Sequence, residues 1–222
     1  MKRLLSTLLI IIGLILILSP IFNKKIIESR VNTTQIIVEE ITSEEIEENT
    51  KEAAVYDFSM IKDVGIASTI TGNIDFNNKN VIGQLTIEDL NINLPILKGV
   101  TNSNLLAGAA TMMPDMEMGK GNYSLAGHYM KDKRLLFGSL MDIEIGSRVK
   151  ITDKKIIYEY EIYDTTIVPD TAFYMLEDKM AEMRGKPIIS LMTCYYTSKN
   201  GKRFFATGEL IDEYPYETGL IN

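Results

Sequence analysis

The first hydrophobic pattern in the chain is an apolar run over residues 4–22 that contains no charged residue. At about 1.5 Å per residue, a helix of this length nearly crosses a hydrocarbon core of about 30 Å. A cleaved secretory signal is the alternative, but such a signal has a shorter apolar stretch and a small-residue cleavage site. This run instead ends in Leu18-Ser19-Pro20-Ile21-Phe22. We therefore predict an uncleaved membrane anchor over residues 1–22.

Residues 23–72 have the pattern of an acidic polar connector. The stretch 39–52 holds seven acidic residues and one basic residue. Thr42 and Glu45 have the spacing of a capping box, and a loose helical stripe is formed by Ile37, Ile41 and Ile46. Runs of charge are usually exposed, so we interpret this connector as a solvated spacer.

From about Asn80 the pattern changes to short segments separated by turn residues. Alternation of apolar and polar positions predicts strands at residues 85–87, 92–96, 149–151, 158–162 and 204–211. The mostly apolar run 188–194 predicts a central strand that is buried on both faces. Residues 102–110 and 171–183 are expected to be helical or loop insertions. For residues 73–222 we predict a mainly β domain, an antiparallel barrel that is closed or nearly closed.

Composition narrows the class of function without changing this architecture. Hydrophobic residues make up 45% and charged residues 24% of the 222-residue chain, as is usual for a folded domain. The net charge is −7, and the absence of a basic patch argues against nucleic-acid binding. The sequence has no Cys/His metal cluster and no glycine-rich phosphate loop, so neither site is predicted.

The chain has one cysteine and one histidine. A single cysteine cannot form an internal disulfide, so Cys194 is either a buried structural residue or a reactive thiol. The turn signal Asn200-Gly201 predicts a hairpin that brings Arg203 close to Cys194, and a guanidinium favours a thiolate or a developing oxyanion. His128 is equally consistent with a structural hydrogen-bonding role, and periodicity alone does not bring it to Cys194.

Several motifs resemble those of the class A sortases, a family of cysteine transpeptidases. Leu191-Met192-Thr193-Cys194, with Arg203 beyond it, is similar to the family's Thr-X-Thr-Cys…Arg signature, although Ser190 stands where many sortases have threonine. Leu125-Ala126-Gly127-His128 is similar to the histidine motif. Residues 104–108 and 118–123 resemble further class A patterns. The resemblance covers roughly residues 80–213 and the N-terminal anchor.

The resemblance implies an eight-stranded closed barrel with a catalytic Cys194, His128 and Arg203. Cys194 would attack the threonine carbonyl of a Leu-Pro-X-Thr-Gly (LPXTG) sorting signal and form a thioester. His128 would transfer the proton and Arg203 would donate hydrogen bonds to the oxyanion. A substrate-binding pocket is implied as well, with the residues Thr193, Met192, Leu105, Leu106 and Ala107.

The implied partners are LPXTG-bearing surface proteins, the amine of a peptidoglycan precursor (lipid II) and the membrane. Because no second apolar run follows the anchor, a single-pass protein is expected, with the domain wholly on one side of the membrane, and our hypothesis is the extracellular face. With ordinary pKa values of about 8.5 for cysteine and 6.5 for histidine, only about 1% of the Cys–His pair would be thiolate and imidazolium. That fraction is enough for a slow enzyme whose substrate is tethered to the same membrane.

No cofactor is expected, with calcium as the one alternative. Some class A sortases bind calcium through acidic residues near the loop before the cysteine strand, where this chain has Glu177, Asp178 and Glu182. Three carboxylates at this spacing are also ordinary on a solvated helix face, and we favour that interpretation.

Three other functions stay open. The chain could be a cysteine protease that releases surface proteins, or a non-catalytic anchored β-barrel binding module with a structural cysteine. Within the sortases, a pilin-polymerising type usually carries a lid and a C-terminal membrane segment. The sequence shows no apolar run near its C-terminus, which favours class A.

Overall fold

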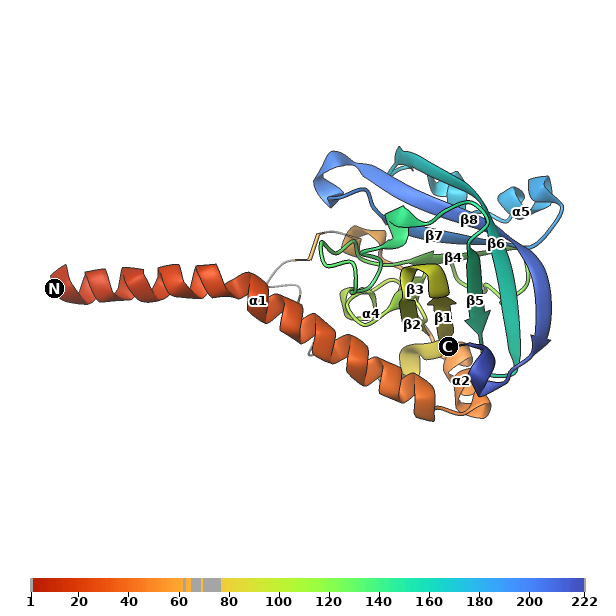
Figure 1. Cartoon of the computed structure of the whole chain (residues 1–222), viewed down its shortest axis with the longest axis horizontal. Coiled ribbons are helices and arrows are strands. Elements are labelled where there is room, and N and C mark those ends of the chain that lie inside the picture. Colours follow the sequence, from red (N-terminus) through yellow and green to blue (C-terminus); the bar gives the residue numbers. More distant parts are fainter. Residues whose placement is uncertain (1, 62, 65–68, 70–76, 222) are drawn as a thin grey trace.

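A long N-terminal helix leads into a β-barrel (Figure 1). The computed structural model describes residues 2–61, 63–64, 69 and 77–221. The described part of the chain contains eight strands: β1 (Val81–Ile87), β2 (Ile92–Leu97), β3 (Ala109–Thr111), β4 (Asn122–Ala126), β5 (Arg148–Thr152), β6 (Ile156–Pro169), β7 (Ile188–Cys194) and β8 (Lys202–Pro215).

The strands close into a barrel in the order β1-β2-β3-β4-β7-β8-β6-β5. The prediction of a closed, mainly β barrel is therefore confirmed. The prediction that it is antiparallel throughout was wrong, because β2 pairs with β3, and β4 with β7, in parallel. Parallel pairs join strands that are distant in the sequence, and alternation within one strand carries no information about such a partner.

The strands that end at the candidate site follow the predicted pattern. Every residue of β7 is buried, as expected for a strand covered on both faces. Between β7 and β8, Gly201 has a φ of +64°, a conformation that glycine adopts without strain. β3 was missed because three residues are too few to show alternation, and it begins inside the segment predicted as an insertion.

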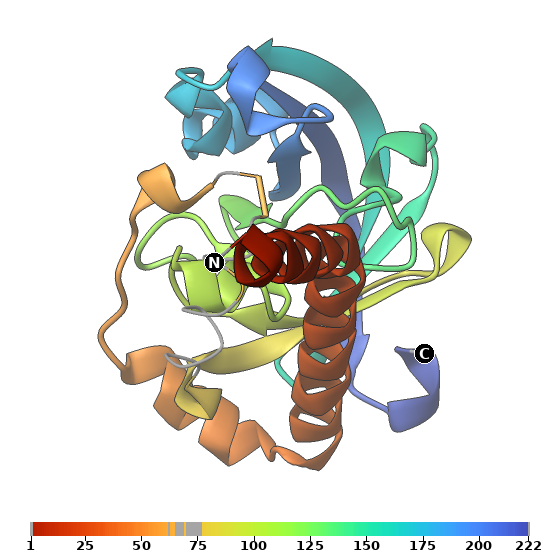
Figure 2. The ribbon, with the colours of Figure 1, turned by 90° about the vertical axis from the view of Figure 1, so that its left-hand side faces the viewer.

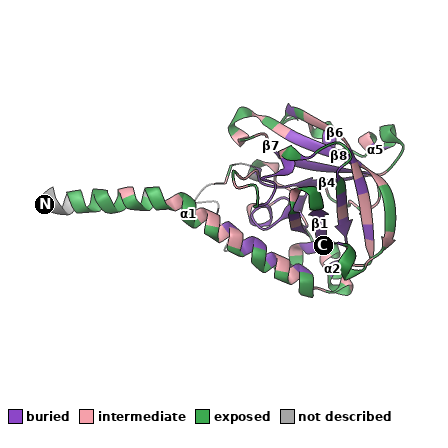
Figure 3. Ribbon diagram, in the orientation of Figure 1, coloured by how far each residue is buried: buried purple, intermediate pink, exposed green. Residues whose placement is uncertain are grey.

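The second half of α1 (Lys2–Glu40) packs against the barrel, while the first half projects away from it (Figures 1 and 3). Ile27 and Val31 join the largest buried cluster, and Val38 packs with residues of β1 and β2 in another. The side chain of Gln35 donates to the Asn93 carbonyl at 2.6 Å. The helix contains Pro20, and a proline inside a helix removes one backbone hydrogen bond and favours a bend.

A second helix, α2 (Ser43–Lys51), continues along the barrel. Its capping box is present as predicted, with Thr42 and Glu45 bonded reciprocally. Ile46 is buried, and the Asn49 side chain donates to the Val81 carbonyl of β1 at 2.8 Å. The interpretation of this region as a solvated spacer was wrong. The apolar side chains of α1 and α2 gain more free energy against the barrel than in water, at about 25 cal/mol per Å².

The remaining elements are short helices in the connections. Residues 171–183 hold two of them, as predicted for an insertion. The described short elements are α4 (Asn102–Leu105), α5 (Lys179–Arg184), η1 (Phe58–Met60), η2 (Asn78–Asn80), η3 (Glu88–Leu90), η4 (Leu140–Asp142), η5 (Phe173–Leu176), η6 (Ser198–Asn200) and η7 (Thr218–Leu220).

The projecting half of α1 is apolar and exposed to its surroundings. Within the described residues, the helix over Ser6–Glu40 is the one element long and apolar enough to cross a membrane. Large apolar side chains such as Leu9, Ile17 and Phe22 are more than half exposed. Such a surface is unfavourable in water and favourable in lipid, which makes this half of α1 a candidate membrane span.

Candidate active site

The thiol and the guanidinium predicted to meet are brought together by the hairpin of β7 and β8. Cys194 is the last residue of β7, and its direct cross-strand partner is Arg203 near the start of β8. The turn chemistry at Asn200-Gly201 sets this register, because it fixes where the chain reverses. This is the part of the site that local sequence patterns predict, and the structure confirms the pairing.

The histidine reaches the same place through the parallel pair of β4 and β7. Ala126, the last residue of β4, lies opposite Met192, and parallel strands run onward in the same direction. Two residues beyond this pair, His128 lies in the segment that follows β4, and Cys194 is the last residue of β7. The register therefore leads the chain's one imidazole and its one thiol toward the same end of this strand pair.

Hydrogen bonds fix the backbone on both sides of His128. The Gly127 amide donates to the Met192 carbonyl at 3.0 Å, and the Thr193 hydroxyl donates to the Gly127 carbonyl at 2.8 Å. The His128 carbonyl accepts from the Phe137 amide at 3.1 Å. A Cβ at position 127 would lie 2.5 Å from the Phe137 ring, so a side chain there would displace this segment. Thr193 thus positions the histidine loop through its hydroxyl.

A segment from before the barrel crosses the ends of β7 and β8. We call this segment the strap; it comprises residues 57–61 and 63, and residue 62 is outside the described residues. At its start the Asp57 amide donates a hydrogen bond to the Val100 carbonyl at 3.1 Å. Ile61 packs in the same buried cluster as Cys194. The Nη2 atom of Arg203 donates a hydrogen bond to the Ile61 carbonyl at 3.4 Å.

Asp63 fastens the other end of the strap to the loop after Cys194. Its carboxylate accepts from the Thr197 hydroxyl and from the Ser198 amide, each at 2.6 Å. With the strap in this position Cys194 is only 2% exposed and His128 only 3% exposed. Neither side chain is therefore open at the surface, where a groove was predicted, and Ile61, from the region interpreted as a spacer, packs in the cluster that buries Cys194.

Sequence reasoning missed the strap, although its composition carried a signal. Tyr56, Phe58 and Ile61 are large apolar residues in what was interpreted as a solvated connector. Such side chains indicate a packed segment rather than a spacer. Phe58 makes an edge-to-face contact with Phe173, with ring centroids 5.7 Å apart.

The surroundings of the Cys194 thiol shift its pKa in both directions. Burial raises the pKa of Cys194 above its ordinary value, whereas the nearby Arg203 guanidinium lowers it. The carboxylates of Asp63 and Asp170 act in the same direction as burial, and the net pKa is raised. Arg203 also lies 3.7 Å from Asp170, which partly neutralises its charge. The structure with the strap in place therefore holds the thiol in its protonated, less nucleophilic form.

We expect Asp63→Ala to speed the alkylation of Cys194 by iodoacetamide by about three- to tenfold between pH 7 and pH 8. The substitution removes a carboxylate that raises the thiol pKa and releases one fastening of the strap, so more thiolate is present at a given pH. Asp89→Ala, which removes an exposed carboxylate in the turn between β1 and β2, is the matched control. Equal rates in the two variants would contradict the role given to Asp63.

A groove of about 310 Å³ lies under the strap. Its lining includes Phe58 and Ile61 from the strap, Met192 and Arg203 from the hairpin, and Phe173 from η5. The groove is mainly apolar, with the Arg203 guanidinium at one side. The apolar surface suits an apolar side chain of an extended peptide, and the guanidinium suits one of its backbone carbonyls.

The other predicted pocket residues are buried in three different places. Leu105 belongs to the cluster that contains Met192 and Cys194, whereas Leu106 belongs to the large central cluster. Ala107 packs with β1, β2 and the end of α1 in the third. Among the five residues predicted to bind substrate, Met192 lines the groove of about 310 Å³. The binding roles of Thr193 and of residues 105–107 stay predictions.

The carboxylates considered for calcium make another contact or are exposed to solvent. An oxygen of Asp178 accepts from the Asn122 amide at 2.8 Å, and Glu177 and Glu182 are exposed. Across the described ranges, no group of three or more His, Cys, Asp or Glu side chains is arranged to hold a metal ion.

Comparison with known proteins agrees with this geometry. The family model for the sortase domain matches residues 85–211. Sortase A of Listeria monocytogenes is 34% identical over 95% of this chain and 91% of its own length. Sortase A of Bacillus anthracis is 32% identical over 93% of this chain and 92% of its own. A solved structure of the Listeria monocytogenes sortase A is 36% identical and has a TM-score of 0.58, covering 64% of this chain and 94% of that one.

Proposed function

The chain belongs to the sortase family as a class A sortase, a cysteine transpeptidase that anchors surface proteins to the cell wall, and we propose that Cys194, His128 and Arg203 carry out the transfer. The observation that carries this proposal is the double pairing of β7. Its antiparallel partner β8 supplies the arginine, and its parallel partner β4 leads to the histidine.

In the first half-reaction the Cys194 thiolate attacks the threonine carbonyl of an LPXTG-type signal. A carbon–sulfur bond forms, the peptide carbon–nitrogen bond breaks, and His128 gives its proton to the leaving glycine amine. Arg203 donates hydrogen bonds to the oxyanion of the tetrahedral intermediate. The groove under the strap takes the apolar residues of the signal, once Ile61 and Phe58 have moved out of it.

In the second half-reaction an amine of a peptidoglycan precursor, lipid II, attacks the thioester. The new carbon–nitrogen bond forms, the carbon–sulfur bond breaks, and His128 takes the proton from the attacking amine. The apolar half of α1 anchors the enzyme in the cell membrane. We place the barrel on the extracellular face, where both substrates are available.

The test uses the full-length chain with a Leu-Pro-X-Thr-Gly peptide, offered with and without an amine acceptor. We expect slow hydrolysis in water and formation of a new amide when triglycine is present, detected by mass spectrometry. A product that is the same with and without amine would identify a protease instead. No cleavage under either condition, even with Asp63→Ala to loosen the strap, would overturn the proposed substrate.

A further inference from the structure

A second hollow, of about 800 Å³, lies against the same strand ends as the groove. Tyr129 and Met130, which follow His128, form one wall, and Tyr196, which follows Cys194, forms another. No described residue lines both hollows. Along β7 and its loop, Met192 lines the groove and Tyr196 lines the cavity, so Cys194 lies between the two along the chain.

The third wall of the cavity is α1, at the point where it leaves the barrel. Pro20, Asn23 and Lys24 line the cavity there, and Lys24 forms an ion pair with Asp132 at 2.6 Å. The apolar run of α1 ends at Phe22, so Asn23 and Lys24, which follow it, lie at the level of the lipid head groups. Figure 2, which shows α1 projecting toward the viewer, places the helix in front of the barrel.

We propose that this cavity is the acceptor site, in which the amine-bearing head group of a lipid-linked precursor approaches the thioester directly from the membrane surface. The inference rests on the proposed function and adds the location and direction of entry of the second substrate. A transpeptidase must hold the acyl group and the amine at once, and two hollows lined by residues on either side of Cys194 in the chain, Met192 and Tyr196, are placed to do so.

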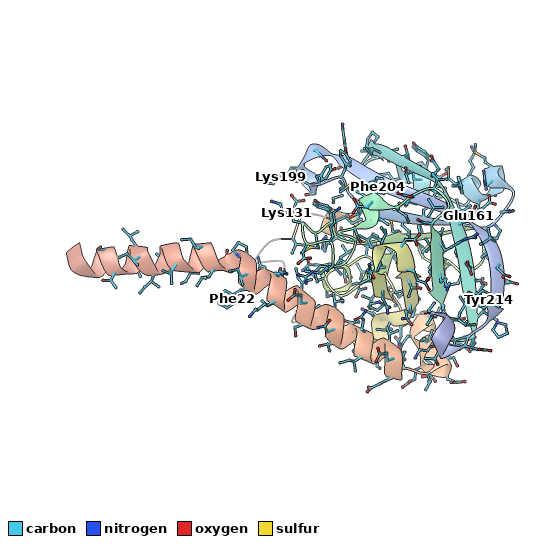
Figure 4. The ribbon with its side chains drawn as sticks, viewed as in Figure 1. Phe22, Lys131, Glu161, Lys199, Phe204 and Tyr214 are labelled. Atoms are coloured by element: carbon cyan, nitrogen blue, oxygen red, sulfur yellow. The ribbon has the colours of Figure 1, made fainter. Side chains whose placement is uncertain are left out.

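The side chains of the cavity match such a head group. Tyr129 and Tyr196 are in edge-to-face contact, with ring centroids 5.7 Å apart, and offer amphipathic faces to a peptide or sugar. Lys131 is exposed on the membrane-facing side of the barrel, the side from which Phe22 and the free half of α1 project (Figure 4). Its ammonium suits the anionic phosphate that links the head group to the lipid.

The test places the full-length chain in phosphatidylcholine vesicles with an LPXTG-type donor peptide and compares two acceptors. One is N-triglycyl-phosphatidylethanolamine in the same vesicles, and the other is soluble triglycine. Two variants alter the cavity: Lys131→Glu reverses its exposed charge, and Asn23→Trp fills it from α1. Lys199→Glu is the matched control, an equal charge reversal on the same side of the barrel outside the cavity lining.

We expect Lys131→Glu to reduce transfer to the lipid-linked amine at least about tenfold and transfer to soluble triglycine by less than about twofold, since one phosphate contact is lost and reversed. Asn23→Trp should reduce lipid-linked transfer by a similar factor, and Lys199→Glu should leave both transfers unchanged. Lipid-linked transfer that is unaffected in both cavity variants, or reduced equally by Lys199→Glu, would overturn the acceptor site. Transfer to triglycine by the unsubstituted chain is measured in parallel. Its presence upholds the proposed function whatever the variants do, and its absence is a failure of that function rather than of the site.

Discussion

Replacement of Cys194 by alanine is expected to lower kcat/KM for peptide cleavage and for amine transfer by at least about 10⁴-fold. The reason is that both half-reactions pass through a thioester on this sulfur, and the chain has no other cysteine that could replace it. The measurement is mass spectrometry of the enzyme with the donor peptide. The unsubstituted chain gains the mass of the acyl group, whereas the variant gains none.

Loss of folding must be separated from loss of chemistry in this experiment. Cys194 is buried, so alanine leaves a small cavity and reduces the free energy of unfolding by about 1 kcal/mol. Cys194→Ser keeps the shape of the side chain while replacing the thiolate by a weaker nucleophile, and it should be nearly as inactive. Turnover by the alanine variant above about 1% of the original rate would mean that the nucleophile lies elsewhere.

The hairpin that carries this cysteine could be predicted from the sequence because its determinants are local. Residues 188–194 are apolar, Asn200-Gly201 is a turn signal, and together they fix which residue of β8 lies opposite Cys194. The capping box of α2 was predictable for the same reason, since Thr42 and Glu45 are one helical turn apart. Each of these features depends on residues that are close in the chain.

The position of His128 could not be predicted from local pattern, because it depends on pairing between distant strands. β4 and β7 are separated by β5 and β6 in the chain, and their parallel register brings Ala126 opposite Met192. Only the resemblance to sortases joined the histidine to the cysteine. The packing of α1 and of the strap also depends on partners that are distant in the chain, because Ile27 and Ile61 are buried by residues of the barrel.

The strap gives the two hollows a common boundary. Ile61 lines the groove of the sorting signal, and Asp63, two residues later, lines the cavity on the other side. A displacement of this one segment would therefore open the groove and remove a carboxylate that raises the thiol pKa. We expect this arrangement to couple access of the donor peptide to activation of Cys194, because both would depend on the same displacement.

Substitution of His128 by asparagine is expected to slow acylation by an LPXTG-type peptide by about 10³-fold, within the range of general acid–base catalysis. Asparagine retains a hydrogen-bonding side chain but cannot exchange a proton at neutral pH. The sharpest measurement compares the amide donor with a p-nitrophenyl ester of the same Leu-Pro-X-Thr peptide, whose leaving group needs no proton. Acylation by the ester should fall by less than about tenfold, because the acid is no longer required.

A structural role for His128 predicts a different result. If the imidazole only held the loop, acylation by the amide and by the ester would fall by the same factor, and thermal unfolding would shift as well. The pH dependence of kcat/KM provides a second test. The unsubstituted chain should give a bell-shaped profile, with one limb set by the imidazole and the other by the thiol. The limb set by the imidazole should be absent in His128→Asn. Burial raises the Cys194 pKa, so the limb that belongs to the thiol should lie above the ordinary value of about 8.5 and move to lower pH in Asp63→Ala. A profile for His128→Asn that keeps both limbs would exclude the histidine as the proton carrier and leave the transfer to another group.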